Sequence, residues 1–131
     1  MRIKVCGLTR EQDAEYAARL GGWGLGFIFY PKSPRYVTPK TVQTILAQLS
    51  AKGLRPERCV GVFVNETAEH IRSAVRESGI DTVQLHGDEG LDLFQELKDL
   101  RLWKAVRLKS ADQFAGLEPF KDYVEAFLFD A

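Results

Sequence analysis

The sequence predicts an α/β fold built on parallel strands, because short strand-like segments alternate with amphipathic helical segments along the chain. The strand-like segments are rich in β-branched and aromatic residues, and capping or glycine signals bound the helical ones. Parallel neighbours need such crossover connections, which are almost always right-handed. A chain of 131 residues can enclose one hydrophobic core, so residues 1–131 are predicted as a single domain.

Strands and helices are predicted in strict alternation from the first residues to the last. The predicted strands are residues 3–6, 25–30, 59–64, 82–85, 103–108 and 126–130. Helices are predicted over residues 11–20 and 39–49, and from a start at 65–67 to residue 78. A fourth helix is predicted after the loop 86–89, ending near residue 98, and a short fifth one after residue 110. Residues 9–12 and 110–113 have the form of a capping box, and Thr38 before Pro39 is typical of a helix start.

Polar residues within two predicted strands indicate how the sheet is covered. Lys4 shares a face with Cys6, and Gln84 shares one with Thr82 and His86, while apolar residues take the opposite faces. An open, doubly wound sheet tends to have continuous apolar strands, whereas a barrel interior tolerates polar groups. The alternation therefore favours a barrel.

Composition excludes several classes of function. Lys plus Arg and Asp plus Glu are 18 each, and no basic or acidic block interrupts this balance. Nucleic acid and membrane surfaces are therefore not expected as partners. No apolar run approaches the roughly 20 residues of a membrane span, and the chain starts without a signal-peptide pattern. Two distant cysteines without a CxxC motif indicate a reduced, cytoplasmic protein.

Cys6 is the first candidate functional residue, because it ends a predicted strand and Gly7 follows it directly. Ligands and catalytic groups collect at the carboxyl ends of parallel strands, and a nearby helix amino end stabilises a thiolate. Packing is the alternative, since buried cysteines usually act as small hydrophobic residues. Cys59, at the amino end of its strand, is interpreted as a core residue.

Arg35 and Asp130 are the other two candidates. Arg35 lies in a loop stiffened by two prolines, where a guanidinium could bind a carboxylate or phosphate, or simply be solvated. Asp130 ends the last predicted strand as Cys6 ends the first, and a charge beside such an apolar segment is costly to place there without a role. An ordinary exposed terminus is its alternative reading.

Metal binding is not predicted. His86 precedes Asp88 and Glu89, but no second histidine or cysteine stands at ligand spacing. His70 is interpreted as an exposed helix residue.

Several segments together resemble phosphoribosylanthranilate isomerase of tryptophan biosynthesis. They span the chain in that family's order and spacing: residues 3–9, 26–37, 60–65, 83–89 and 127–130. The resemblance implies a (βα)8 barrel and an Amadori rearrangement of N-(5'-phosphoribosyl)anthranilate to 1-(2-carboxyphenylamino)-1-deoxyribulose 5-phosphate, without metal or organic cofactor. It assigns Asp130 as the general acid, Cys6 as the general base and Arg35 to the anthranilate portion of the substrate.

The resemblance also implies that part of the barrel is missing. A (βα)8 barrel needs roughly 200 residues or more, whereas this chain reaches only a sixth strand, about (βα)5β6. The phosphate loops of such barrels follow strands seven and eight, so the chain by itself is expected to be inactive or weakly active. Its six strands are expected to self-associate through open edges or to relax to an open, flavodoxin-like sheet.

Three rival functions remain at this point. Indole-glycerol-phosphate synthase is a related barrel, but it uses lysine and glutamate at strand ends. A flavodoxin-like binding module would need an acidic cluster or phosphate loop after the first strand, which residues 7–10 do not provide. A non-catalytic barrel fragment, serving folding or assembly, is the third.

Overall fold

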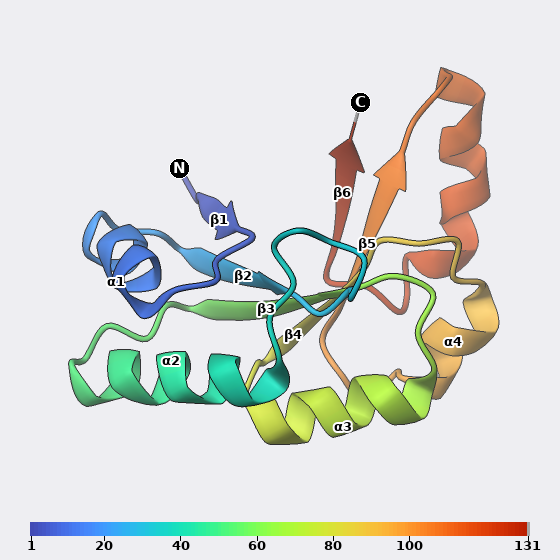
Figure 1. Ribbon diagram of the computed structural model, residues 1–131. Coiled ribbons are helices and arrows are strands. Elements are labelled where there is room, and N and C mark those ends of the chain that lie inside the picture. The colour runs from blue at the N-terminus through green and yellow to red at the C-terminus, as the bar shows by residue number, and fades with distance from the viewer. Residues whose placement is uncertain (131) are drawn as a thin grey trace.

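The computed structural model describes residues 1–130, and it forms one parallel sheet covered by helices (Figure 1). The strands are β1 (Lys4–Cys6), β2 (Gly24–Ile28), β3 (Arg58–Phe63), β4 (Thr82–Leu85), β5 (Leu102–Arg107) and β6 (Ala126–Asp130). The helices are α1 (Glu11–Arg19), α2 (Pro39–Ala51), α3 (Ala68–Ser78), α4 (Leu91–Glu96) and the 3₁₀ helix η1 (Ala111–Phe120). The predicted alternation is confirmed, with small shifts at the element ends.

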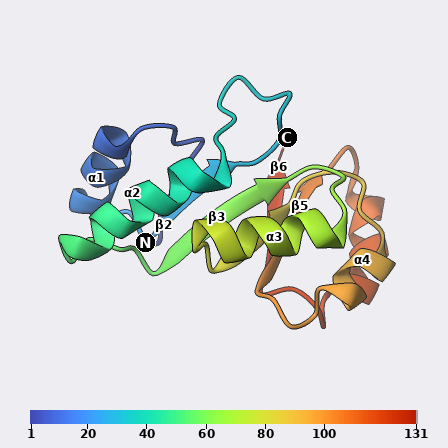
Figure 2. The same ribbon diagram turned by 60° about the horizontal axis from the view of Figure 1, so that its bottom comes forward.

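The strands follow one another in the sheet in chain order, β1-β2-β3-β4-β5-β6, and every neighbouring pair is parallel. Singly wound order places all crossover helices on one face, so the sheet curls into a half-barrel with the helices outside (Figures 1 and 2). A flavodoxin-like sheet needs a reversal of strand order, which is absent from the six strands that the structure describes. The flavodoxin-like expectation is therefore wrong, and the truncated-barrel expectation is confirmed.

The hydrophobic core lies between the sheet and its helices. Phe27 of β2, Leu85 of β4 and Phe94 of α4 are completely buried in it. Residues at alternate positions point to the concave face instead, which is where Lys4 and Gln84 meet. The mixed face predicted from the alternation is thus the inside of the half-barrel.

Local sequence signals start and end most of the helices. The Thr38 hydroxyl accepts the Thr41 N–H at 3.2 Å with Pro39 at the first helical position, and Gly79 ends α3 in the left-handed conformation. The capping box predicted at residues 9–12 is wrong. Arg10 is the N-cap without a side-chain cap, and its guanidinium forms an ion pair with Asp13 instead.

The second capping box is also not formed. Ser110 is the N-cap residue of η1 but makes no capping bond, while the Gln113 side chain accepts the Lys109 N–H at 2.7 Å. The predicted short helix is present as a 3₁₀ helix whose residues are all partly or fully exposed. Phe120 at its end packs against the core, but the segment has no fully buried face of the kind that stabilises regular α-helices.

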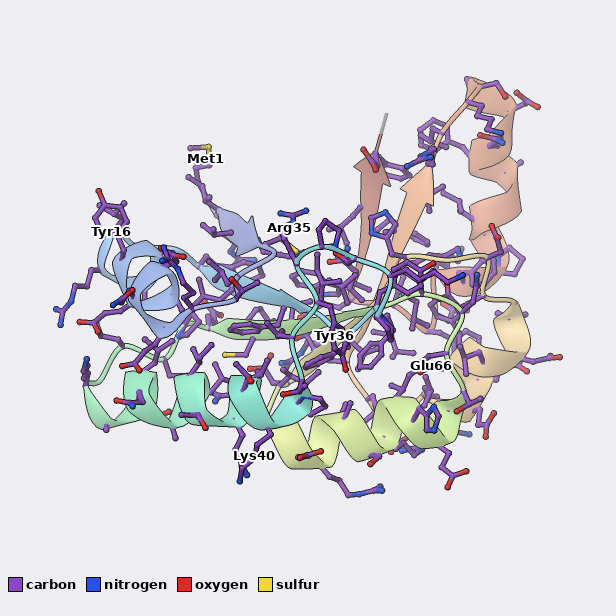
Figure 3. All side chains as sticks on the ribbon, in the orientation of Figure 1. Met1, Tyr16, Arg35, Tyr36, Lys40 and Glu66 are labelled. Atoms are coloured by element: carbon purple, nitrogen blue, oxygen red, sulfur yellow. The ribbon has the colours of Figure 1, made fainter. Side chains whose placement is uncertain are left out.

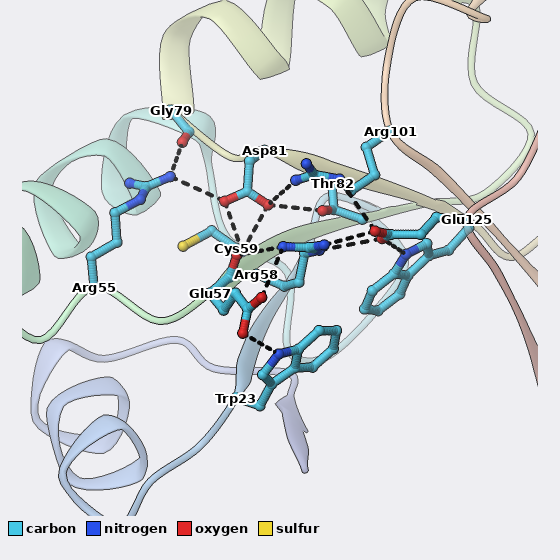
Figure 4. A network of polar contacts seen from close by, with 11 residues as sticks. Trp23, Arg55, Glu57, Arg58, Cys59, Gly79, Asp81, Thr82, Arg101 and Glu125 are labelled. Carbon is cyan, nitrogen blue, oxygen red and sulfur yellow. Dashed lines mark hydrogen bonds and ion pairs between the residues drawn. The ribbon is translucent and has the colours of Figure 1, made fainter. Parts of the chain in front are cut away.

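The amino ends of the strands are joined by a polar network (Figure 4). Asp81, just before β4, accepts the Cys59 N–H at 3.1 Å and the Thr82 hydroxyl at 2.8 Å. Across the half-barrel, the Arg58 guanidinium donates two hydrogen bonds to the Glu125 carboxylate at 2.7 and 3.2 Å. These contacts tie β3, β4 and β6 together at the end of a barrel where stability rather than catalysis is usually located.

Two strand edges remain open among the described residues. β1 pairs only with β2, and β6 pairs only with β5. Large apolar side chains are exposed near both edges, with Ile3 and Phe129 each about half exposed. No helix of the described chain is long and apolar enough to cross a membrane.

Candidate active site

The candidate site lies at the carboxyl ends of the strands, on the concave side of the half-barrel. Cys6 is the last residue of β1 and is exposed, so the thiol is not a packing residue. Gly7 then turns the chain with a φ of 83°, a left-handed conformation that glycine adopts without strain. By contrast, Cys59 is fully buried at the amino end of β3, as predicted.

Arg35 lies directly over this turn (Figure 3). Its guanidinium donates a hydrogen bond to the Cys6 carbonyl oxygen at 3.3 Å, and the backbone N–H of Arg35 donates to the Ser33 hydroxyl oxygen at 3.1 Å. A methyl group on Gly7 would lie 2.6 Å from the Arg35 Cζ, so only glycine leaves room for this arginine. The structure therefore brings Arg35 and Cys6 together, from segments that are far apart in the sequence.

Asp130 ends β6, and its side chain is about half exposed. His86, directly after β4, approaches it with Nε2 at 3.8 Å from the Asp130 Oδ2. The acid thus has a potential proton donor beside it. Sequence reasoning considered His86 only as a metal ligand, although its place at the end of a strand was already evident.

Lys4 and Gln84 extend this polar cluster into the half-barrel. The Lys4 ammonium donates to the Gln84 Oε1, and the Gln84 Nε2 lies 3.4 Å from the His86 Nδ1. Lys4 also stands above the Trp103 ring, at 5.5 Å from its centroid. The alternation placed both residues on the inner face, but nothing local showed that residues 80 positions apart would meet.

The carboxylate of Glu89, which follows β4, holds the surrounding loop by hydrogen bonds. The Glu89 carboxylate is buried and accepts the Asn65 N–H at 2.9 Å and the Gly87 N–H at 2.8 Å. In return the Asn65 Oδ1 accepts the Asp88 N–H at 2.8 Å, from a backbone with a φ of 51°. No group of three or more possible metal-binding side chains occurs in residues 1–130.

A cavity of about 740 Å³ opens beside this loop, between the ends of β3, β4 and β5 and the helix η1. His86 and Arg107 line it on the concave side. Lys104 lines it too, with its ammonium above the Phe94 and Phe120 rings at 5.2 and 4.6 Å, and burial lowers the pKa of this lysine. His86 thus borders a space large enough for a small molecule, whereas Cys6, Arg35 and Asp130 lie outside its lining.

Cys6 and Asp130 end β1 and β6, the two edge strands of the described sheet, so they lie at opposite edges of the half-barrel. Each has a cationic or potentially cationic neighbour, Arg35 at the backbone carbonyl oxygen of Cys6 and His86 at the Asp130 carboxylate. Polar groups at the carboxyl ends of a curved, singly wound parallel sheet define the (βα)-barrel class of proteins.

Comparisons with known proteins give the family within this class. The model of the family described as N-(5'-phosphoribosyl)anthranilate (PRA) isomerase matches residues 3–131. The isomerases of Rippkaea orientalis and Synechococcus elongatus are 41% and 44% identical to the whole chain. The chain belongs to the N-(5'-phosphoribosyl)anthranilate isomerase family.

Solved structures agree with this assignment. The phosphoribosyl anthranilate isomerase of Thermotoga maritima superimposes on the whole chain with a TM-score of 0.89 at 29% identity. Another isomerase structure, in complex with reduced 1-(o-carboxyphenylamino)-1-deoxyribulose 5-phosphate, matches 98% of the chain with a TM-score of 0.83 at 28% identity. The chain spans 61% of the length of each of the two curated relatives and 62% of the Thermotoga chain.

Proposed function

We propose that this chain carries the acid–base residues of an isomerase that converts N-(5'-phosphoribosyl)anthranilate to 1-(2-carboxyphenylamino)-1-deoxyribulose 5-phosphate, in tryptophan biosynthesis. The observation that supports it most is the position of Cys6 and Asp130 at the carboxyl ends of the first and last strands, both accessible. The family of the chain and the ligand of the related complex are consistent with the same reaction.

In this proposal Asp130 acts as the general acid. Its carboxyl group gives a proton to the furanose ring oxygen, the ring opens, and the anthranilate nitrogen forms a Schiff base with C1'. Cys6, as a thiolate, then removes the proton from C2' and leaves an enolamine, which tautomerises to the ketone. The reaction needs an acid and a base on different sides of the sugar, which matches residues on opposite strands of the half-barrel.

Arg35 is proposed to bind the anthranilate carboxylate. Its guanidinium is fixed by one hydrogen bond to the Cys6 carbonyl oxygen, and the remaining N–H groups can form a fork for a carboxylate. This would place the anthranilate ring next to the thiol. The hydrogen bond from Arg35 to the Cys6 carbonyl oxygen would also set the distance between a bound anthranilate and the Cys6 thiol.

The substrate phosphate has no proposed site in this chain. In (βα)8 barrels phosphate is usually bound after strands seven and eight, at a helix amino end, whereas the described chain has six strands. We therefore propose that the 131-residue chain has little turnover by itself. We also propose a cytoplasmic location, since both cysteines are free thiols.

A complementation assay tests this proposal. The chain is mixed with the carboxyl-terminal two fifths of the Rippkaea relative, and turnover of N-(5'-phosphoribosyl)anthranilate is measured. We expect turnover to appear in the mixture and to fall at least about 100-fold with Cys6→Ala or Asp130→Asn. Structure without turnover would support the non-catalytic fragment instead, and full turnover of the chain alone would contradict the need for added strands.

Self-association is the remaining proposal, supported by the two open strand edges and by the exposed Ile3 and Phe129 beside them. Sedimentation of the chain should show an oligomer that dissociates when Ile3 is changed to lysine. The exposed Tyr16, on α1, offers a control position where the same charge is not at a strand edge. A monomer at all concentrations would refute the proposal.

A further inference from the structure

Two inward-facing residues of β1 converge over the same glycine of β2. Lys4 and Cys6 pair with Gly24 and Gly26 in the register of the sheet. A methyl group on Gly26 would lie 2.7 Å from the Cys6 Sγ and 3.0 Å from the Lys4 Cε, so both side chains fold over this position. Burial lowers the pKa of the Lys4 ammonium, and the nearby Cys6 opposes that change. The lysine side chain is therefore a cationic neighbour of the thiol on the inner face.

The hydrogen bonds beyond Lys4 have only one consistent direction. An ammonium group is a donor only, so the Gln84 Oε1 accepts from Lys4 and the Gln84 Nε2 points to His86. An amide nitrogen is also a donor only, so the His86 Nδ1, at 3.4 Å, must accept. A neutral His86 then carries its proton on Nε2, the atom that faces Asp130 at 3.8 Å.

This inner chain of Lys4, Gln84 and His86 connects the two candidate catalytic residues across the concave face. We propose that these three are positioning residues: Lys4 places a positive charge beside the Cys6 thiol, and Gln84 holds His86 in the tautomer that presents Nε2–H to Asp130. The inference rests on the proposed function, because it assigns these residues to the same acid–base pair.

The proposed effects act at the points where charge is present or develops. A cation beside Cys6 favours the thiolate that must accept the C2' proton. When Asp130 has given its proton to the ring oxygen, it becomes a carboxylate, and the His86 N–H can then stabilise that new charge. Each residue is therefore proposed to act through the acid or the base.

The first test measures the reactivity of Cys6 in the 131-residue chain, without substrate. Cys59 is fully buried and stays silent, so iodoacetamide reports on Cys6 alone. In Lys4→Met we expect the alkylation rate at pH 7 to fall about tenfold, as one nearby cation shifts the thiolate fraction by about that factor. Lys4→Arg keeps the charge and should restore the rate. Arg35, the other cation near Cys6, is unchanged in all variants.

Lys104→Met is the matched control for loss of a buried lysine, because Lys104 lies on the outer side of β5 against Phe94 and Phe120. Its Cys6 should react at the wild-type rate. Circular dichroism checks that each variant is folded. An unchanged rate in a folded Lys4→Met chain, or an equal decrease in Lys104→Met, would overturn the role of Lys4.

The second test reads the histidine tautomers by ¹⁵N NMR. His86 should be protonated on Nε2, whereas His70, whose Nδ1 lies 3.3 Å from the Glu66 carboxylate, should be protonated on Nδ1. Gln84→Met removes the donor and should leave His86 with mixed tautomers while His70 is unchanged. An unaltered His86 spectrum in this variant would overturn the role of Gln84.

These outcomes are separable from those of the proposed function. A chain that passes both tests but shows no turnover with the added segment would refute the isomerase assignment and leave the inner chain intact. Conversely, turnover in the complemented protein with wild-type kcat for Lys4→Met and Gln84→Met would refute the positioning roles alone.

Discussion

Because the thiol of Cys59 is buried, we expect the protein to lose stability at alkaline pH. Its side chain is completely buried, and burial raises the pKa of the thiol from its ordinary value of 9.0 to about 12. The folded state therefore holds the proton more tightly than the unfolded state. The contribution to stability is fully present below pH 9 and is lost as the pH rises towards 12.

The size of this loss follows from the two pKa values. One pH unit between them is worth about 1.4 kcal/mol, so raising the pH from 8 to 10.5 should cost about 2 kcal/mol of unfolding free energy. Urea unfolding followed by circular dichroism measures it. Because lysines and tyrosines also titrate in this range, the relevant quantity is the difference between the wild-type chain and Cys59→Ala.

The stability advantage of the wild-type chain over Cys59→Ala should shrink by about 2 kcal/mol between pH 8 and pH 10.5. Cys6→Ala is the control, because Cys6 is exposed and its removal should leave the alkaline loss in place. If the curves of the wild-type chain and Cys59→Ala run parallel, the thiol is not held neutral by burial and the argument is refuted.

Three further predictions concern other parts of the fold. Arg58 lowers the pKa of Glu125, so this pair stabilises the fold above the ordinary glutamate value of 4.5 and less as the pH falls; Glu125→Gln should flatten the acid side of the stability profile. Thr38→Ala should cost about 1 kcal/mol in urea unfolding, with Thr38→Ser close to wild type. Gly26→Ala should cost about 1–3 kcal/mol by overpacking and change the alkylation rate of Cys6; wild-type stability and rate together would contradict the close approach at this glycine.

Local signals were sufficient to predict the elements but not the contacts between them. Thr38 before Pro39, and Gly79 after α3, are read within one turn of helix, and both predictions are confirmed. The capping box at residues 9–12 failed because Arg10 could pair with Asp13, a competing interaction of similar size.

In the candidate site, too, local signals predict the position of a residue but not its contacts with distant residues. The alternation along β1 and β4 placed Lys4 and Gln84 on the inner face, because side-chain direction depends only on position in a strand. Their hydrogen bond depends on the curvature of the sheet, which arises from the packing of all six strands and is not encoded at either residue. The approach of His86 to Asp130 is equally non-local.

The two proposed catalytic residues lie on the two strands that are least constrained by pairing. β1 has three residues and one neighbour, and β6 likewise hydrogen-bonds to a single strand within the described sheet. The separation between thiol and carboxylate is therefore set by how far the half-barrel curls, and contacts across the concave face help to oppose its opening. The inner chain from Lys4 to His86 is one such contact, and the Arg58–Glu125 pair at the opposite end of the strands is another. Strands that pair with both open edges would fix this separation between the proposed acid and base.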